Sequence, residues 1–184
     1  MPPRSLRVRA LQWLAQREQS RTELRCKLMP HARAEVEAER RAEAEAPAEV
    51  EAGRLPIERS APQPAVERVD ALLDWLEAHE YLSQQRFVES RVHARQGRFG
   101  NLRIREELKA HRATLAPDAV QALNDSELQR ALHVLAKKFG QPPTDLAERG
   151  RQFRFLSGRG FSSETIQRAL RDAARPAADP QPGD

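Results

Sequence analysis

Apolar residues recur at three- and four-residue spacing along most of this chain, but only in short runs that end at glycine, proline or a polar turn. The stretch 69–76 is one such run, and Ile104 with Leu108 belongs to another. Residues spaced in this way lie on one face of an α-helix. The pattern predicts short amphipathic helices that each bury one face, and no strand is obvious.

The helical prediction agrees with a composition in which aromatic residues make up only 5% and β-branched residues are sparse. Nine predicted helices group into three sets of three. A three-helix unit of about 45 residues buries little apolar surface by itself, so we expect the sets to stack. The fold class we predict is all-α, with three tandem three-helix repeats.

An unusual segment, residues 31–65, interrupts the first repeat. Its first half is rich in alanine, glutamate and arginine, and its second half contains several prolines. We interpret it as a solvated insertion, partly helical before Pro47 and flexible afterwards. The predicted organisation is a first repeat over 1–82 with this insertion, a second over 83–124, a third over 125–175, and a disordered tail over 176–184.

Several classes of function are disfavoured. A lone cysteine, Cys26, cannot form an internal disulfide, which suits a reducing compartment and a cytoplasmic location. No apolar run approaches the roughly 20 residues of a membrane span. The five histidines lack metal-ligand spacing, and no phosphate-binding glycine motif or catalytic constellation is present. We therefore expect no enzyme activity, no catalytic residue, no metal, no cofactor and no membrane partner.

The formal net charge of +4 conceals strong alternation. Residues 1–30 and 83–113 each carry +5 and residues 151–175 carry +4, whereas the insertion carries −3 and residues 66–82 carry −4. Arginine contacts phosphates and carboxylates alike through its bidentate fork. Three basic blocks at repeat spacing favour binding, along one strip if the repeats stack in register.

The predicted binding residues are these basic side chains: Arg21, Arg25, Lys27, Arg91, Arg95, Arg98, Arg103, Arg105, Lys109, Arg154 and Arg159. The alternative is that they lie on solvated helix faces, paired with nearby glutamates. Phe99, in a glycine-flanked turn among them, could stack on a base or fill a junction between repeats.

Five strings then occur in a recognisable order. They read ALxxLxxRExSRxELRxKL over 10–28, YLxxxRF over 81–87, GxxRIRxEL over 100–108, KKF over 137–139 and RFLxxRGFS over 154–162. Together they resemble the RecX family, regulators of the RecA recombinase, over nearly the whole helical body.

Some positions depart from the family pattern. The insertion is longer than the usual first connection, and Ser83-Gln84 replaces a pair of acids. Ala32 and Arg112 stand where a glycine often closes the second helix of a repeat. Those helices must end without the usual left-handed glycine or continue further.

The resemblance implies an elongated, curved array that lies along the groove of the RecA–single-stranded DNA filament. It implies a monomer that mainly inhibits ATP hydrolysis, strand exchange and co-protease activity in DNA repair and the SOS response, with weaker direct DNA binding. The alternative is an autonomous helical nucleic-acid-binding protein that needs no recombinase. For the insertion, an acidic tether that competes with DNA and simple tolerated length both stay open.

Overall fold

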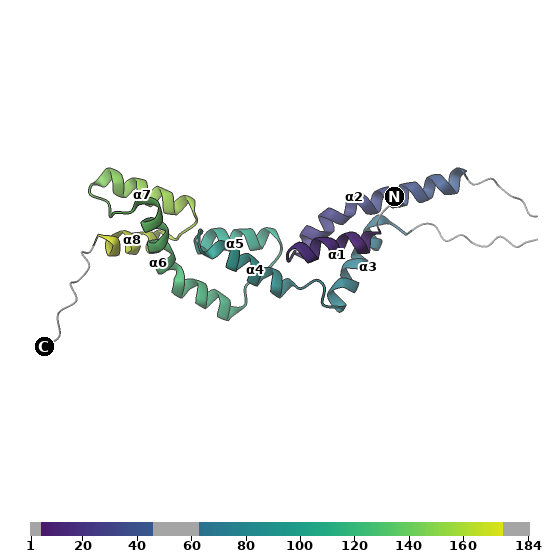
Figure 1. Cartoon of the computed structure of the whole chain (residues 1–184), viewed down its shortest axis with the longest axis horizontal. Coiled ribbons are helices and arrows are strands. Elements are labelled where there is room, and N and C mark those ends of the chain that lie inside the picture. Colours follow the sequence, from purple (N-terminus) through teal and green to yellow (C-terminus); the bar gives the residue numbers. More distant parts are fainter. Residues whose placement is uncertain (1–4, 46–62, 175–184) are drawn as a thin grey trace, which may run out of the picture. The chain divides into compact units, whose positions relative to one another are not determined.

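A computed structural model describes residues 5–45 and 63–174, in which all regular structure is helical (Figure 1). Eight helices occur in these ranges: α1 (Leu6–Gln16), α2 (Arg21–Glu45), α3 (Ala65–Ala78), α4 (Gln84–Gln96), α5 (Asn101–Ala110), α6 (Pro117–Phe139), α7 (Leu146–Gly158) and α8 (Ser163–Ala173). The predicted all-α class is confirmed.

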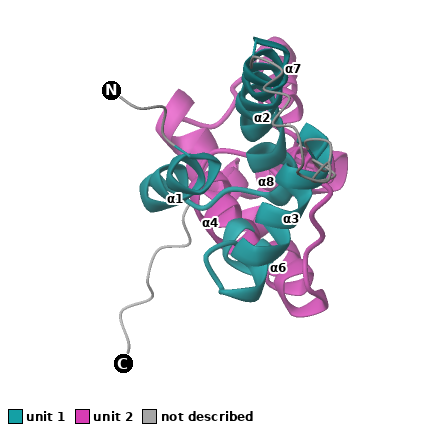
Figure 2. Ribbon diagram, turned by 90° about the vertical axis from the view of Figure 1, so that its right-hand side faces the viewer, with its two compact units in different colours: residues 1–87 teal, residues 88–184 magenta. Residues whose placement is uncertain are grey.

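Two compact units make up the chain, Met1–Phe87 and Val88–Asp184, with the division inside α4 (Figure 2). In the first unit α1, α2 and α3 pack around a core that includes Leu24, Leu28 and Leu73. In the second, α6, α7 and α8 enclose a core of their own, which contains Phe161 among buried aliphatic side chains. Each unit therefore has an independent apolar interior.

The start of α2 was predicted correctly, and the segment before Pro47 is helical as predicted, as far as Glu45, although it is not wholly solvated. The Ser20 hydroxyl accepts a hydrogen bond from the Glu23 amide at 3.1 Å, as expected for a helix cap. The helix then continues through Pro30 to Glu45, so residues 31–45 are an ordered part of α2. Ala32 and Val36 explain this, because both are buried, Ala32 within the core of the first unit.

A contact with α3 supports the extension further. The Arg68 guanidinium pairs with both carboxylate oxygens of Glu39, one of them at 2.6 Å. This hydrogen bond lowers the pKa of Glu39. The rest of the predicted insertion, apart from residues 63–65, lies outside the described residues.

We predicted nine helices, and the described residues form eight, because two of the predicted helices are fused in α6. Pro117 occupies the first turn as predicted, and no glycine or proline interrupts the residues that follow. The polar stretch 124–126 stays helical, with the Ser126 hydroxyl donating to the carbonyl of Ala122 at 2.8 Å. The predicted boundary between the second and third repeats therefore falls inside one continuous helix.

The two positions that lack the expected glycine behave differently. Ala32 lies within α2, so that helix continues past it. Arg112 instead adopts a left-handed backbone with φ of 54°, and the next amide, of Ala113, donates to the carbonyl of Leu108 at 2.9 Å. This is the closure that Gly160 makes after α7, where φ is 78°.

Gly100 and Gly160 bring the start of α5 against the end of α7. The Gly100 amide donates to the carbonyl of Arg159 at 2.9 Å, and the Leu102 amide donates to that of Gly160 at 3.0 Å. A β-carbon at Gly100 would overlap the Gly160 carbonyl, and one at Gly160 would lie 2.6 Å from the Arg103 nitrogen. Only glycine at both positions permits this approach.

We predict that Gly100→Ala and Gly160→Ala each destabilise the second unit by about 2–4 kcal/mol, because the added methyl group forces the two segments apart. Urea unfolding followed by hydrogen exchange at amides of the second unit measures this, since Trp13 and Trp75 both report on the first. Gly97→Ala is the control, because a β-carbon there meets nothing within 4 Å. Equal stability of all three variants would contradict the close contact.

Candidate nucleic-acid interface

Phe99, in the turn between α4 and α5, is half-buried and surrounded by arginines. The guanidinium carbons of Arg103, Arg95, Arg98 and Arg159 lie 5.0, 5.7, 5.9 and 6.0 Å from its ring centre. These distances are within the range of cation–π attraction. We call these five residues the Phe99 cluster. It joins four of the predicted binding residues, which come from α4, the turn after it, α5 and the end of α7.

The contact of Gly100 with Gly160 places Arg159 in this cluster. Its side chain donates to the carbonyl of Arg98 at 3.1 Å, and its guanidinium carbon also lies 4.5 Å from the ring centre of Phe155. Arg159 therefore lies against two phenylalanine rings. Residues 61 positions apart in sequence meet here through backbone and side-chain contacts.

Arg130 of α6 holds the Phe99 turn from the inside. Its guanidinium donates to the carbonyls of Phe99 at 2.8 Å, Leu123 at 2.9 Å and Gln96 at 3.3 Å. It also donates to the Asn101 side chain. Burial lowers the pKa of Arg130, although the charge of Glu127 acts in the opposite direction. An arginine nevertheless stays protonated in a protein, so the donors persist.

Glu127 supports the same turn from one helical turn earlier in α6. It is only 6% exposed and accepts from the Asn101 amide at 2.8 Å, at the start of α5. It also accepts from the Thr165 hydroxyl at 2.8 Å, at the start of α8. One carboxylate thus binds the N-terminal ends of two helices, where negative charge is favourable.

A hollow of about 430 Å³ opens beside the Phe99 cluster. It is lined by Gly97, Arg98, Val134, Lys137, Lys138, Phe155 and Arg159. No carboxylate belongs to this set of described residues. We call it the basic hollow, and its four cations beside an aromatic ring suit a phosphate with an adjacent base.

Charge compensation differs between the other predicted residues. Arg91 and Arg95 project together, as predicted, and both pair with Glu107, at 3.2 and 3.0 Å. One carboxylate therefore contacts two guanidinium groups at the edge of the Phe99 cluster.

The predicted residues of the first unit are paired within it. Arg21 contacts Asp74 at 2.7 Å and Glu77 at 2.6 Å, both on α3. Arg25 binds Asp70 at 2.7 Å, and this hydrogen bond lowers the pKa of that carboxyl. For these two arginines the alternative interpretation, pairing with nearby acids, is the observed one.

The four remaining predicted residues are Lys27, Arg105, Lys109 and Arg154. Lys27 contacts Gln19 at 2.8 Å and Glu23 at 3.4 Å. Arg105 donates to the Asn124 side chain at 2.9 Å, and it lines a separate groove together with Lys109. Arg154 is exposed on α7, outside the Phe99 cluster. A single strip through all three basic blocks stays a prediction.

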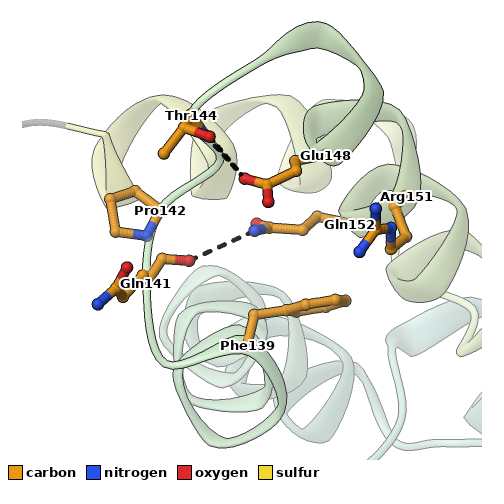
Figure 3. A pocket seen from close by; sticks show the side chains of 7 residues that line it. All are labelled: Phe139, Gln141, Pro142, Thr144, Glu148, Arg151 and Gln152. Carbon is orange, nitrogen blue, oxygen red and sulfur yellow. Dashed lines mark hydrogen bonds between the residues drawn. The ribbon is translucent and has the colours of Figure 1, made fainter.

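A second hollow, of about 240 Å³, lies where α6 connects to α7 (Figure 3). The Thr144 hydroxyl donates to Glu148 at 3.0 Å, and the Gln152 amide donates to the carbonyl of Gln141 at 3.4 Å. These groups stabilise the connection and the start of α7. We therefore assign the hollow a structural role.

Sequence reasoning missed four residues of this interface: Glu127, Arg130, Lys137 and Lys138. The two lysines lie in residues 114–150, a stretch whose net charge of −1 concealed them. Within the described ranges no group of metal-binding side chains gathers. In those same ranges no helix is long and apolar enough to cross a membrane.

Comparison with known proteins agrees with the resemblance. A family described as "RecX, third three-helix domain" matches residues 125–170. The chain is 41% identical to "Regulatory protein RecX" of Ralstonia pickettii (strain 12J), covering 93% of this chain and 89% of that protein. It is 42% identical to the Leptothrix cholodnii protein of that name, over 92% and 90%, and 38% identical to the one from Herbaspirillum seropedicae, over 97% of each.

We predict that Arg130→Met destabilises the second unit by about 3 kcal/mol, because the partly buried carbonyls of Phe99 and Leu123 lose a charged donor. Hydrogen exchange should accelerate most at residues 97–101. Arg149→Met, which removes an exposed arginine of α7, is the matched control and should change stability by less than about 0.5 kcal/mol. Unchanged exchange in the turn would show that Arg130 does not hold it.

Proposed function

This chain belongs to the RecX family of regulatory proteins, and from that premise we propose that it binds the RecA–single-stranded DNA filament and mainly inhibits it. The reduced activities are ATP hydrolysis, strand exchange and co-protease function. The regulator acts by occupying the filament, without chemistry of its own and without a cofactor.

The basic hollow, which no described carboxylate lines and which lies beside the Phe99 cluster, is the observation that carries the DNA-binding part of this proposal. Phosphates bind favourably where cations lack carboxylate partners, and neutralising them releases counterions from the DNA. Aromatic rings beside those cations allow bases to stack without regard to sequence. A regulator that must act on any stretch of filament needs this sequence tolerance.

We also propose that the paired arginines of α2 contact the filament. Exposed ion pairs contribute only about 0–1 kcal/mol each, so Arg21 and Arg25 can exchange their carboxylates for a filament group at small cost. Arg154 adds charge on α7. We keep these residues, with Lys27, Arg91, Arg105 and Lys109, as proposed contacts to the filament.

An autonomous DNA-binding protein is the second candidate, and the basic hollow favours it because phosphate binding there requires no recombinase. The two proposals differ in what tight binding requires. An autonomous binder holds a single-stranded oligonucleotide tightly at physiological salt, whereas a filament regulator binds it weakly and binds the filament tightly.

We predict that substoichiometric amounts of this protein lower the single-stranded-DNA-dependent ATPase rate of RecA. The triple variant Arg98→Gln, Lys137→Gln and Lys138→Gln should require at least about tenfold more protein, since it loses three cations and their phosphate contacts. A triple variant at Arg149, Arg168 and Arg171, all exposed, removes the same charge elsewhere in the second unit.

The salt dependence of DNA binding distinguishes the loss of direct phosphate contacts from a general loss of positive charge. Removing three phosphate contacts on single-stranded DNA should reduce the slope of log K against log salt by about 2, whereas the control variant should change it little. Fluorescence anisotropy of labelled oligo-dT, with and without RecA, measures binding to the filament and to free single-stranded DNA. An ATPase rate unchanged by the wild-type protein at every salt concentration would reject the filament proposal.

A further inference from the structure

A second groove of the second unit differs in character from the basic hollow. It lies between the end of α5 and the start of α6 and has a volume of about 500 Å³, within the range of about 300–1,000 Å³ typical of binding pockets. Leu108, Ala113, Leu115 and Val120 line it, and Leu115 and Val120 are half-buried. No aromatic side chain of the described chain lines this groove, so it offers no ring on which a base could stack.

Three cations stand around this apolar surface: Arg105, Lys109 and Arg112, all exposed. No carboxylate is among the described residues that line the groove. Arg105 donates a hydrogen bond to the Asn124 side chain at 2.9 Å. Because asparagine is neutral, this contact does not neutralise the arginine. The groove therefore combines apolar walls with a positive rim.

The backbone at Arg112 points to a role for this rim. Its φ of 54° is left-handed, a conformation that is strained for an ordinary residue and unstrained for glycine. Gly160 closes α7 with the equivalent hydrogen bonds and without that strain. A basic side chain thus stands at the groove where glycine would be more stable, and strain of this kind is found at functional sites.

We propose that this groove, the α5–α6 groove, docks an acidic segment of a partner protein that also carries a large apolar side chain. Carboxylates of the segment would meet the basic rim, and its apolar side chain would cover Leu115 and Val120. Nucleic acid would match only the basic rim, because no ring of the groove can stack on a base and the apolar walls would stay uncovered. The inference goes beyond the filament proposal, since it requires only a partner of this chemistry.

The test uses the full-length protein with methyl-labelled leucine and valine, observed by NMR. The probe is a short peptide of alternating glutamate and leucine with a central phenylalanine. Two comparison peptides replace its apolar residues with serine or its glutamates with lysine, and oligo-dT is a fourth ligand. RecA is absent, so failure of the filament proposal does not affect the result.

We expect the acidic apolar peptide to shift the methyl signals of Leu115 and Val120. Both comparison peptides should bind at least about tenfold more weakly, because each loses one of the two contributions. Lys109→Glu should weaken binding of the probe to a similar extent. Arg168→Glu, which makes the same charge change on α8, should leave it unaltered, and so should Arg98→Gln in the basic hollow.

Other results would overturn the proposal. Equal affinity for the serine peptide would mean that charge alone attracts the probe, and absence of methyl shifts would mean that the groove does not bind it. Shifts at these methyls with oligo-dT would assign the groove to DNA. Shifts that depend on protein concentration without peptide would assign the groove to a second copy of the chain. Shifts caused by deleting residues 46–62 or 175–184 would assign it to that segment of the same chain.

Discussion

The candidate interface depends on one backbone contact, between Gly100 and Gly160. Two amide-to-carbonyl hydrogen bonds join the start of α5 to the end of α7 at a separation that no side chain permits. Because of it, Arg159 lies beside Phe99, although the two residues are 60 positions apart in sequence. The surface that we propose to bind DNA is therefore a product of close packing between backbones, supported from α6 by Arg130.

The basic residues differ in how far nearby carboxylates already neutralise them, and therefore in how well they can bind an anion. Arg21 and Arg25 pair with acids of α3, and Arg95 shares Glu107 with its neighbour one turn away. Lys137 and Lys138 instead line a hollow to which no carboxylate of the described chain contributes. An anion gains most where it replaces no existing partner, which makes the basic hollow the favoured phosphate site.

Much of the fold followed from local patterns, and the failures have physical causes. Helix starts at Ser20 and Pro117 were predictable because caps and first-turn prolines act within a few residues. The packing of the second half of α2 was not, since the burial of Val36 depends on tertiary contacts rather than on local sequence. The fusion within α6 was missed because polar residues at 124–126 are typical of turns, yet Ser126 satisfies its hydrogen bonds within the helix.

The amino-acid sequence established the helical class, the family and the three concentrations of positive charge, because periodicity, motifs and charge are properties of neighbouring residues. It also identified Arg95, Arg98, Arg103 and Arg159 as candidates, without showing that they meet. Packing selected among the eleven candidates, since pairing with an acid or contact with Phe99 depends on residues distant in sequence. The positions of the charges could be read from the sequence, whereas the fold decided which of them are available to a partner.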